Sequence, residues 1–255
     1  EGPIVYNHAR IGETYDARLE CDNWKSPDFD DSDWENAIIA ASPGGILEEN
    51  PITTPVRVVN ETTSKHIGNG IYDCGNITSG WVKIKLNANY GDEFKISYAE
   101  NLNEDGSLAR DNINLYNLST RQRHEDIYYA NGKGEEEYAP SFVYHSFRYV
   151  QITASVQPVS VVCQTVHNDI RTTGCFECNI DILNKIHEMC CRSIRTNGMN
   201  LPTDPPGRFQ GPWTGDAAIT CEVSLHNFDM KSLYKKWMND FKDAQRPSGQ
   251  LPGVD

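Results

Sequence analysis

Apolar and polar residues alternate along the chain between about residue 50 and residue 166. Residues 82–86 alternate valine, isoleucine and leucine with lysine, and residues 94–98 resume the alternation after a turn at residues 90–92. A period of two puts successive side chains on opposite faces of a strand, so the pattern predicts a hairpin with one face in water. Further strands are expected at residues 126–129, 147–152 and 159–166, with turns at Asp105-Gly106, Asn131-Gly132 and Pro158. Short strands separated by such turns predict a β-sandwich.

After residue 174 the apolar residues recur with the period of a helix. The first helix is expected to begin after Asn179 as its N-cap and to end near Gly198, and Asp229 is expected to cap the third. The apolar stripes are Leu183, Ile186, Cys190 and Ile194, then Ala218, Cys221, Leu225 and Phe228, then Leu233, Trp237 and Phe241. Three such helices predict the opening of an all-α array whose apolar flanks stay exposed unless something covers them. We therefore expect the chain to be cut inside that array.

A long connection, residues 201–216, joins the first two helices and carries unusual chemistry for a loop. Its prolines and glycines forbid a continuous helix or a central strand, and most helix-to-helix connections need only about 2–8 residues. Its functional side chains are Asp204, Arg208, Trp213 and Asp216. An indole offers a flat apolar face to a sugar ring, while carboxylates and a guanidinium bond its hydroxyls, so the loop is a candidate sugar site. Alternatively, Trp213 fills the core and Asp216 caps the next helix.

Aromatic residues are dense in the β region and raise the same choice between site and core. They are Trp81, Tyr128, Tyr129, Tyr138, Tyr144, Phe147 and Tyr149. These rings could line a sugar platform, but we expect most of them to point inward.

The overall composition narrows the classes of partner. The chain has 255 residues and a net charge of −13, which argues against nucleic acid and anionic membranes because phosphate groups demand clustered lysine and arginine. Neutral glycans remain suitable. No apolar run approaches the roughly 20 residues that span a bilayer, so we expect a soluble protein, cytoplasmic or periplasmic.

The cysteines and acidic runs do not predict a metal site or a cofactor. Eight cysteines are too sparse for a disulfide scaffold, and most are expected to be buried thiols. Cys175 and Cys178 have the spacing of half a zinc site, but no second pair follows. The acidic run at residues 27–34 lacks the order of a calcium loop, so we expect a turn held by Phe29 and Trp34.

Several strings, in their order and spacing, make the chain resemble the bacterial α-L-rhamnosidases over nearly its whole length. In the β region they are Gly12-Glu-Thr-Tyr-Asp-Ala-Arg18, Tyr72-Asp-Cys-Gly-Asn76, Gly80-Trp81, Tyr98-Ala-Glu100 and Tyr144-His-Ser-Phe-Arg-Tyr149. In the helical region they are Gly174-Cys-Phe-Glu-Cys178, Thr203-Asp204, Trp213-Thr-Gly-Asp-Ala217, Tyr234-Lys-Lys-Trp237 and Asp243-Ala-Gln245. The resemblance implies a multidomain β + α protein. Residues 1–45 would end an N-terminal β domain, residues 46–168 would form a jelly-roll-like β-sandwich, and residues 169–255 would begin an (α/α)6 six-hairpin barrel.

The resemblance also implies an inverting hydrolase that releases terminal α-linked L-rhamnose from plant glycosides or polysaccharides. Inversion needs a carboxyl that protonates the leaving oxygen and a second that activates water, about 6.5–9.5 Å apart. The two environments must differ, because one carboxyl needs a raised pKa and the other stays ionised. The residues that would inherit rhamnose contacts are Asp204, Arg208, Trp213 and Asp216.

The sequence departs from the family pattern where the general acid is expected. Phe209 and Gln210 follow Arg208, and neither a phenyl ring nor an amide delivers a proton. The family's general base is expected beyond Asp255. The chain therefore lacks both catalytic carboxyls as assigned, and we expect poor catalysis unless Glu222 or Glu177 replaces the acid.

Two other functions stay open. The chain could be a non-catalytic relative that binds rhamnose or another carbohydrate, or a six-hairpin glycosidase for another sugar, such as a uronic acid whose carboxylate pairs with Arg208. The uncovered helix faces also predict self-association, with a homodimer as its simplest form.

Overall fold

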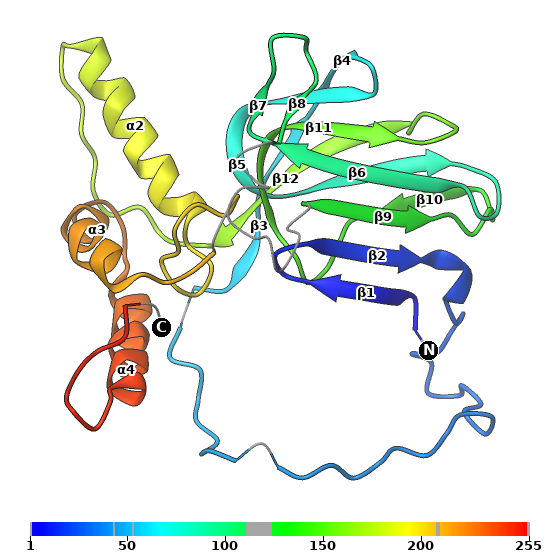
Figure 1. Cartoon of the computed structure of the whole chain (residues 1–255), viewed down its shortest axis with the longest axis horizontal. Helices are drawn as coiled ribbons and strands as arrows, with labels where there is room; N and C mark the ends of the chain where they lie inside the picture. Colours follow the sequence, from blue (N-terminus) through cyan, green and yellow to red (C-terminus); the bar gives the residue numbers. More distant parts are fainter. Residues whose placement is uncertain (1, 43, 53, 111–123, 208–209, 254–255) are drawn as a thin grey trace.

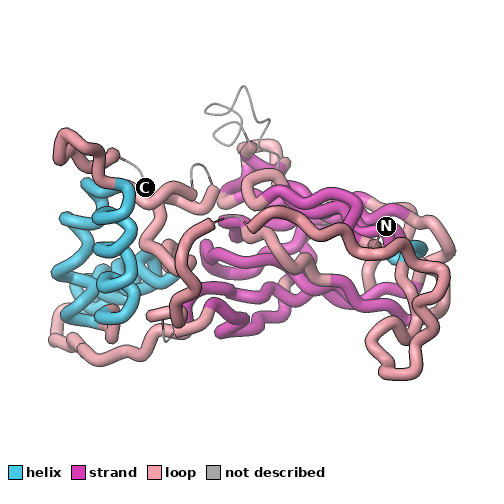
Figure 2. Tube along the Cα trace, turned by 90° about the horizontal axis from the view of Figure 1, so that it is seen from below, coloured by secondary structure: helices cyan, strands magenta, loops and turns pink. Residues whose placement is uncertain are grey.

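The structure is a computed structural model that describes residues 2–42, 44–52, 54–110, 124–207 and 210–253. A curled sheet occupies one end of the molecule and three helices the other (Figures 1 and 2). The strands of the main sheet are β1 (Ile4–His8), β2 (Gly12–Asp16), β3 (Val56–Thr63), β4 (Lys65–Gly68), β5 (Ile71–Asn87), β6 (Glu93–Ala99), β9 (Glu125–Tyr129), β10 (Glu135–Tyr138), β11 (His145–Thr153) and β12 (Ser160–Asn168). Strands β7 (Asn101–Leu102) and β8 (Leu108–Ala109) form a separate ribbon, and a 3-10 turn η1 covers Ala17–Leu19.

The main sheet runs in the order β1-β2-β9-β6-β11-β5-β12-β3, with β4 and β10 paired to β5. Strands β2 and β9 are parallel, and the other described pairs are antiparallel. The expected strands at 126–129, 147–152 and 159–166 are confirmed as β9, β11 and β12. The prediction of β-sheet architecture followed by the first barrel helices is confirmed.

The predicted hairpin between residues 82–86 and 94–98 is wrong. Both segments are strands, but β11 lies between β5 and β6 in the sheet order. The apolar side chains of the two segments are fully buried and face one core, where the Val82 amide approaches the Tyr98 hydroxyl at 3.5 Å. The turn at residues 90–92 therefore joins two strands that do not pair with each other. Because the sheet is curled, both strands can still bury their apolar side chains in the same core.

The cysteine prediction is also wrong. Cys74 on β5 and Cys163 on β12 form a disulfide inside the core of the sheet. The other six cysteines are free thiols, and each is exposed or half-buried.

The helices are α2 (Asp181–Thr196), α3 (Thr214–Asn227) and α4 (Lys231–Ala244). Their N-caps are Ile180, Trp213 and Met230, so the caps expected at Asn179 and Asp229 are wrong. The Asp229 carboxylate instead accepts from the Arg171 guanidinium at 2.9 Å, an ion pair that holds the start of α4 beside the segment leading into α2.

The three predicted apolar stripes differ in how far they are buried. In α4 the stripe is confirmed, because Leu233 and Trp237 are buried in the helical core. In α3 the predicted stripe is confirmed only in part: Phe228 is buried and Cys221 packs against the helical core, but Leu225 is 49% exposed. Polar Asn227 turns inward instead, since its oxygen meets His187 of α2 at 2.8 Å and its nitrogen donates to the Val223 carbonyl. In α2 no residue is fully buried: Ile194 packs against the helical core, whereas Leu183 and Ile186 stay largely exposed.

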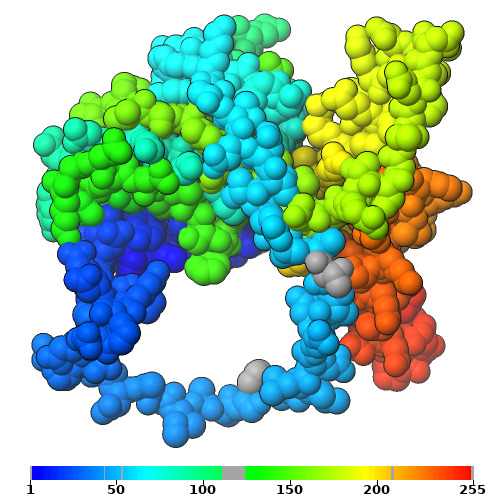
Figure 3. Space-filling model, turned by 180° about the vertical axis from the view of Figure 1, so that it is seen from behind, coloured from blue at the N-terminus to red at the C-terminus, as the bar shows by residue number. Residues whose placement is uncertain are grey.

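The described residues between η1 and β3 arch away from the sheet (Figures 1 and 3). Phe29 and Trp34 pack ring to ring at 5.3 Å, which confirms the expected turn in the acidic run. None of the helices in the described part of the chain is long and apolar enough to cross a membrane.

Candidate functional site

The loop between α2 and α3 is closed by its own hydrogen bonds. The Asp204 amide donates to the Gly211 carbonyl at 3.0 Å, and the Gly211 amide donates back to Asp204 Oδ1 at 2.8 Å. The Thr203 amide and hydroxyl both donate to the Asn197 carbonyl at the end of α2. The Asp204 carboxylate is therefore held in one orientation, opposite Gly211, which lies two residues before Trp213.

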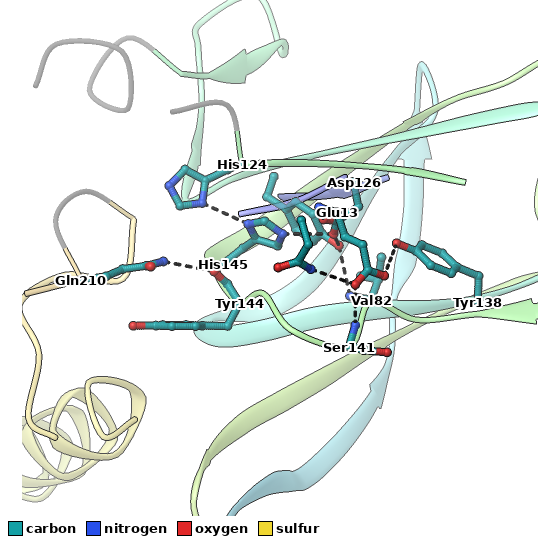
Figure 4. Close-up of polar contacts among 11 residues, drawn as sticks. Glu13, Val82, His124, Asp126, Tyr138, Ser141, Tyr144, His145 and Gln210 are labelled. Atoms are coloured by element: carbon teal, nitrogen blue, oxygen red, sulfur yellow. Dashed lines mark hydrogen bonds and ion pairs between the residues drawn. The ribbon is translucent and has the colours of Figure 1, made fainter. Parts of the chain in front are cut away.

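Tyr144, just before β11, joins this loop to the sheet. Its side chain contacts Thr203, and burial raises the pKa of its hydroxyl to about 12, an effect that the negative charge of Asp204 reinforces. Gln210 donates from Nε2 to the Tyr144 carbonyl at 3.1 Å and to the Pro206 carbonyl at 2.9 Å (Figure 4). The amide at the expected general-acid position thus has a structural role, because it fastens the loop to the sheet.

Trp213 and Asp216 stand at the start of α3. Trp213 is the N-cap residue and is 37% exposed, so the alternative in which it fills the core is wrong. No side chain caps α3, and Asp216 lies exposed within the first turn, so the capping alternative is wrong as well. A carboxylate in the first turn still complements the helix dipole.

The segment that follows α4 returns to this point: the Thr214 amide and hydroxyl both donate to the Gly253 carbonyl. Arg208 and Phe209 lie outside the described residues. The structure therefore brings Asp204 and Trp213 into one stretch of loop and puts Asp216 beside Trp213 on α3.

A buried polar network behind the loop was not anticipated from the sequence. His145 Nε2 lies 3.0 Å from Asp126 Oδ2, and His145 Nδ1 lies 3.1 Å from His124 Nδ1 (Figure 4). Asp126 also accepts from the Tyr98 hydroxyl at 2.7 Å and from the Glu13 amide at 2.9 Å. Apart from the Glu13 amide, the groups come from β6, β9 and β11 and the residue before β9. One signal was available, because Asp126 occupies an inward position in the alternation of β9.

The electrostatics of this network follow from its burial. Burial lowers the pKa of His124 to about 3, helped by His145 and Arg110, while the backbone of Gly207 favours the protonated ring. Burial also raises the pKa of Glu13, whose carboxylate accepts from Tyr138, Ser141 and Asn7. His124 is therefore a neutral ring at neutral pH and carries one N–H.

No metal centre emerges among the described residues, where no three histidine, cysteine, aspartate or glutamate side chains gather as ligands. Cys175 is exposed and Cys178 is half-buried, with its thiol directed to the Ile180 carbonyl at 3.5 Å.

Three family descriptions match the chain in order. They are the alpha-L-rhamnosidase N-terminal domain at residues 1–60, the bacterial alpha-L-rhamnosidase concanavalin-like domain at residues 63–169 and the bacterial alpha-L-rhamnosidase 6 hairpin glycosidase domain at residues 171–255. The chain is 33% identical over 260 residues to an alpha-L-rhamnosidase of Formosa agariphila, covering 97% of this chain and 27% of that protein.

Solved structures agree with the family matches. The alpha-L-rhamnosidase from Dictyoglumus thermophilum superposes with a TM-score of 0.92 at 39% identity, over 99% of this chain and 29% of that one. The Streptomyces avermitilis alpha-L-rhamnosidase complexed with L-rhamnose gives 0.88 at 31% identity, over 99% of this chain and 25% of that one. The chain thus spans about a quarter of the length of the relatives it matches.

Proposed function

Because this chain belongs to the bacterial α-L-rhamnosidase family, we propose that it binds terminal α-linked L-rhamnose of glycosides or polysaccharides through the loop between α2 and α3. The observation that carries the proposal is the ordered run of three rhamnosidase domain families along the chain. Hydrolysis with inversion is the reaction we assign to a protein that holds the complete site. The division into domains at residues 45 and 168 belongs to the same proposal.

Each loop residue has a role that its chemistry supports. The Trp213 indole packs on the apolar C–H face of the deoxyhexose, as its exposed position permits. Asp204 and Asp216 accept hydrogen bonds from sugar hydroxyls, and Arg208 donates to them. The fixed orientation of Asp204 favours this role, because a preoriented acceptor loses less conformational entropy on binding.

The chain as it stands is proposed to be a poor catalyst. Phe209 and Gln210 occupy the expected acid position, and the Gln210 amide is engaged by two backbone carbonyls. The Glu222 side chain is 89% exposed and Glu177 is exposed too, so neither has the buried environment that keeps a general acid protonated. Absence of a general acid typically lowers the rate by about 10²–10⁴-fold.

The test is a calorimetric titration of the chain with L-rhamnose, paired with an assay of p-nitrophenyl α-L-rhamnoside. We expect binding without release of nitrophenol at enzyme-like rates. Trp213→Ala is expected to weaken binding by about tenfold, because the stacking face is lost. Trp24→Ala is the matched control, since Trp24 is also an exposed indole, at 55%, but belongs to the segment between η1 and β3 and not to the loop before α3. Equal affinities of the parent and Trp213→Ala would contradict the proposal.

The second candidate is a non-catalytic rhamnose-binding relative, favoured by the phenyl and amide side chains at the acid position. Hydrolysis of the rhamnoside at enzyme-like rates by any protein that carries this loop unchanged would rule out the non-catalytic candidate. The remaining alternative is a glycosidase for a uronic acid. A competition titration of rhamnose against a uronic acid distinguishes it from a rhamnose-binding protein, because only the glycosidase needs Arg208 to pair with a carboxylate.

A further inference from the structure

Gly207, in the middle of the loop, is buried against the sheet. A Cβ added there would lie 3.1 Å from Glu100 Oε1 and 3.4 Å from Ser146 Cβ. The backbone dihedral at Gly207 is not in the left-handed region, so it is the close approach to the side chains of Glu100 and Ser146 that favours glycine. The loop backbone therefore touches the β domain with no side chain in between.

Glu100 and Ser146, which contact Gly207, are fixed by a hydrogen bond to each other. Ser146 Oγ donates to Glu100 Oε1 at 2.5 Å, and Ser146 is almost fully buried. Ser146 lies on β11, and Glu100 follows the last residue of β6, its neighbour in the sheet, where Tyr149 is opposite Ala99. A carboxylate fixed by a charge-assisted hydrogen bond on paired strands is a firm surface against which a loop can rest.

The buried histidine pair lies behind this contact but does not hold it. The His124 ring is fully buried, and among the described residues its Nε2 has no hydrogen-bond partner. His145 Nε2 faces the Asp126 carboxylate at 3.0 Å, so a neutral His145 ring donates there and accepts at Nδ1 from the Nδ1–H of His124. The neutral His124 ring then has no N–H to offer the Gly207 backbone.

We propose that Glu100 and Ser146 are positioning residues that hold the backbone at Gly207 and thereby set the conformation of the described loop residues 203–207 and 210–211. The inference rests on the proposed function, because this loop matters through the rhamnose contacts assigned to it. Gln210 is fastened to the Tyr144 carbonyl, so the described part of the loop meets the sheet at a second residue. The β domain thus prepares the binding loop before sugar arrives.

The first test is amide hydrogen exchange of the 255-residue chain without sugar. The reporters are the Asp204 and Gly211 amides, whose mutual hydrogen bonds close the loop. Gly207→Ala is expected to speed their exchange by about tenfold, because the added methyl group lifts the backbone off Glu100. Gly253→Ala is the control, since a Cβ there meets nothing within 4 Å. Parent-like exchange in Gly207→Ala would overturn the proposal.

A second pair of variants keeps the proposal testable if Gly207→Ala unfolds. Glu100→Gln retains an acceptor for Ser146, whereas Glu100→Ala removes it. We expect parent-like exchange in the first and faster exchange of Asp204 and Gly211 in the second, with amides of β5 unchanged in both. Equal amide exchange rates in Glu100→Gln and Glu100→Ala would contradict the proposal that Glu100 positions the Gly207 backbone.

Titration of the same variants with rhamnose separates this inference from the proposed function. Rhamnose affinity should fall in Gly207→Ala and Glu100→Ala but hold in Glu100→Gln. Amide exchange in the loop could respond as expected while neither the parent nor any variant binds rhamnose. In that case the positioning role of Glu100 and Ser146 holds and the proposed function fails.

Discussion

His124 shows how burial sets the charge of a side chain in the sheet. It is surrounded by His145, Arg110 and the Gly207 backbone, and its ring is kept neutral by burial. A histidine with a depressed pKa stabilises the folded state above its ordinary pKa, and this contribution is lost as the pH falls, because the unfolded chain takes up a proton that the folded chain refuses.

We therefore expect the free energy of unfolding to fall as the pH drops from about 6.5 towards 3, by on the order of a few kcal/mol from His124. His167, whose pKa burial also lowers, adds a slope of the same sign. Glu13 acts in the opposite direction, because its raised pKa makes its contribution full below 4.5 and lost as the pH rises through the raised value.

Urea unfolding between pH 7 and 5 measures the slope where the two histidines dominate. His124→Gln should flatten it, while the exposed His8→Gln should leave it as in the parent. An unchanged slope in His124→Gln would show that this ring is protonated in the folded state.

At the scale of elements, burial patterns were readable along each strand but not around every helix. Strands β5 and β6 bury the apolar side chains that the sequence pattern predicted. The alternation of side chains along a strand does not depend on which strands lie beside it. Helix α3 followed its apolar stripe at Cys221 and Phe228 but not at Leu225, because the Asn227 contact with His187 turns a polar side chain towards α2. The position of β11 between β5 and β6 likewise reflects pairing between segments far apart in the chain.

The disulfide between β5 and β12 gives an element-scale prediction. Its cysteines are 89 residues apart, and closing a loop of that length restricts the unfolded chain by about 4–5 kcal/mol in the chain-entropy account. Replacing both Cys74 and Cys163 by serine should lower the free energy of unfolding by roughly that amount, as read from urea midpoints under non-reducing conditions. Cys21→Ser, at an exposed free thiol, is the control. If dithiothreitol leaves the parent midpoint unmoved, the bond does not contribute.

At the scale of the whole molecule, the helical end carries apolar surface that the sheet does not cover. On α2, Leu183 is 42% and Ile186 is 43% exposed, and both face away from the described core. Contiguous exposed apolar surface of this kind favours association. The shared face of the helices, with Trp237 in its core, also packs against Ile170 and Leu201 of the connecting segments.

We expect sedimentation velocity to reveal concentration-dependent association of the chain, with a dimer as the first species. Leu183→Lys combined with Ile186→Lys should shift the distribution to monomer without lowering the thermal midpoint, because no buried contact is lost. Glu188→Lys, which adds positive charge off the stripe of the same helix, is the comparison. A monodisperse parent monomer at high concentration would contradict the prediction.

Recognition of the family needed no coordinates, since the strings around Trp213 and Tyr144 are contiguous in the chain. Strand positions, the helical region and the loop were also predictable, because hydrophobic period and turn chemistry are local. The seating of Gly207 against Glu100, the caps of α2 and α4 and the pairing of Cys74 with Cys163 were not, because each depends on residues brought together from distant segments.

By itself, the sequence determined which segments become strands or helices and which family the chain resembles. The tertiary structure alone decided which strands are neighbours, that Trp213 stays partly exposed, and that Gly207 lies against the carboxylate of Glu100. The physical reason is the same in each case: local periodicity encodes the direction of a side chain, whereas its partner is selected by packing across the whole fold.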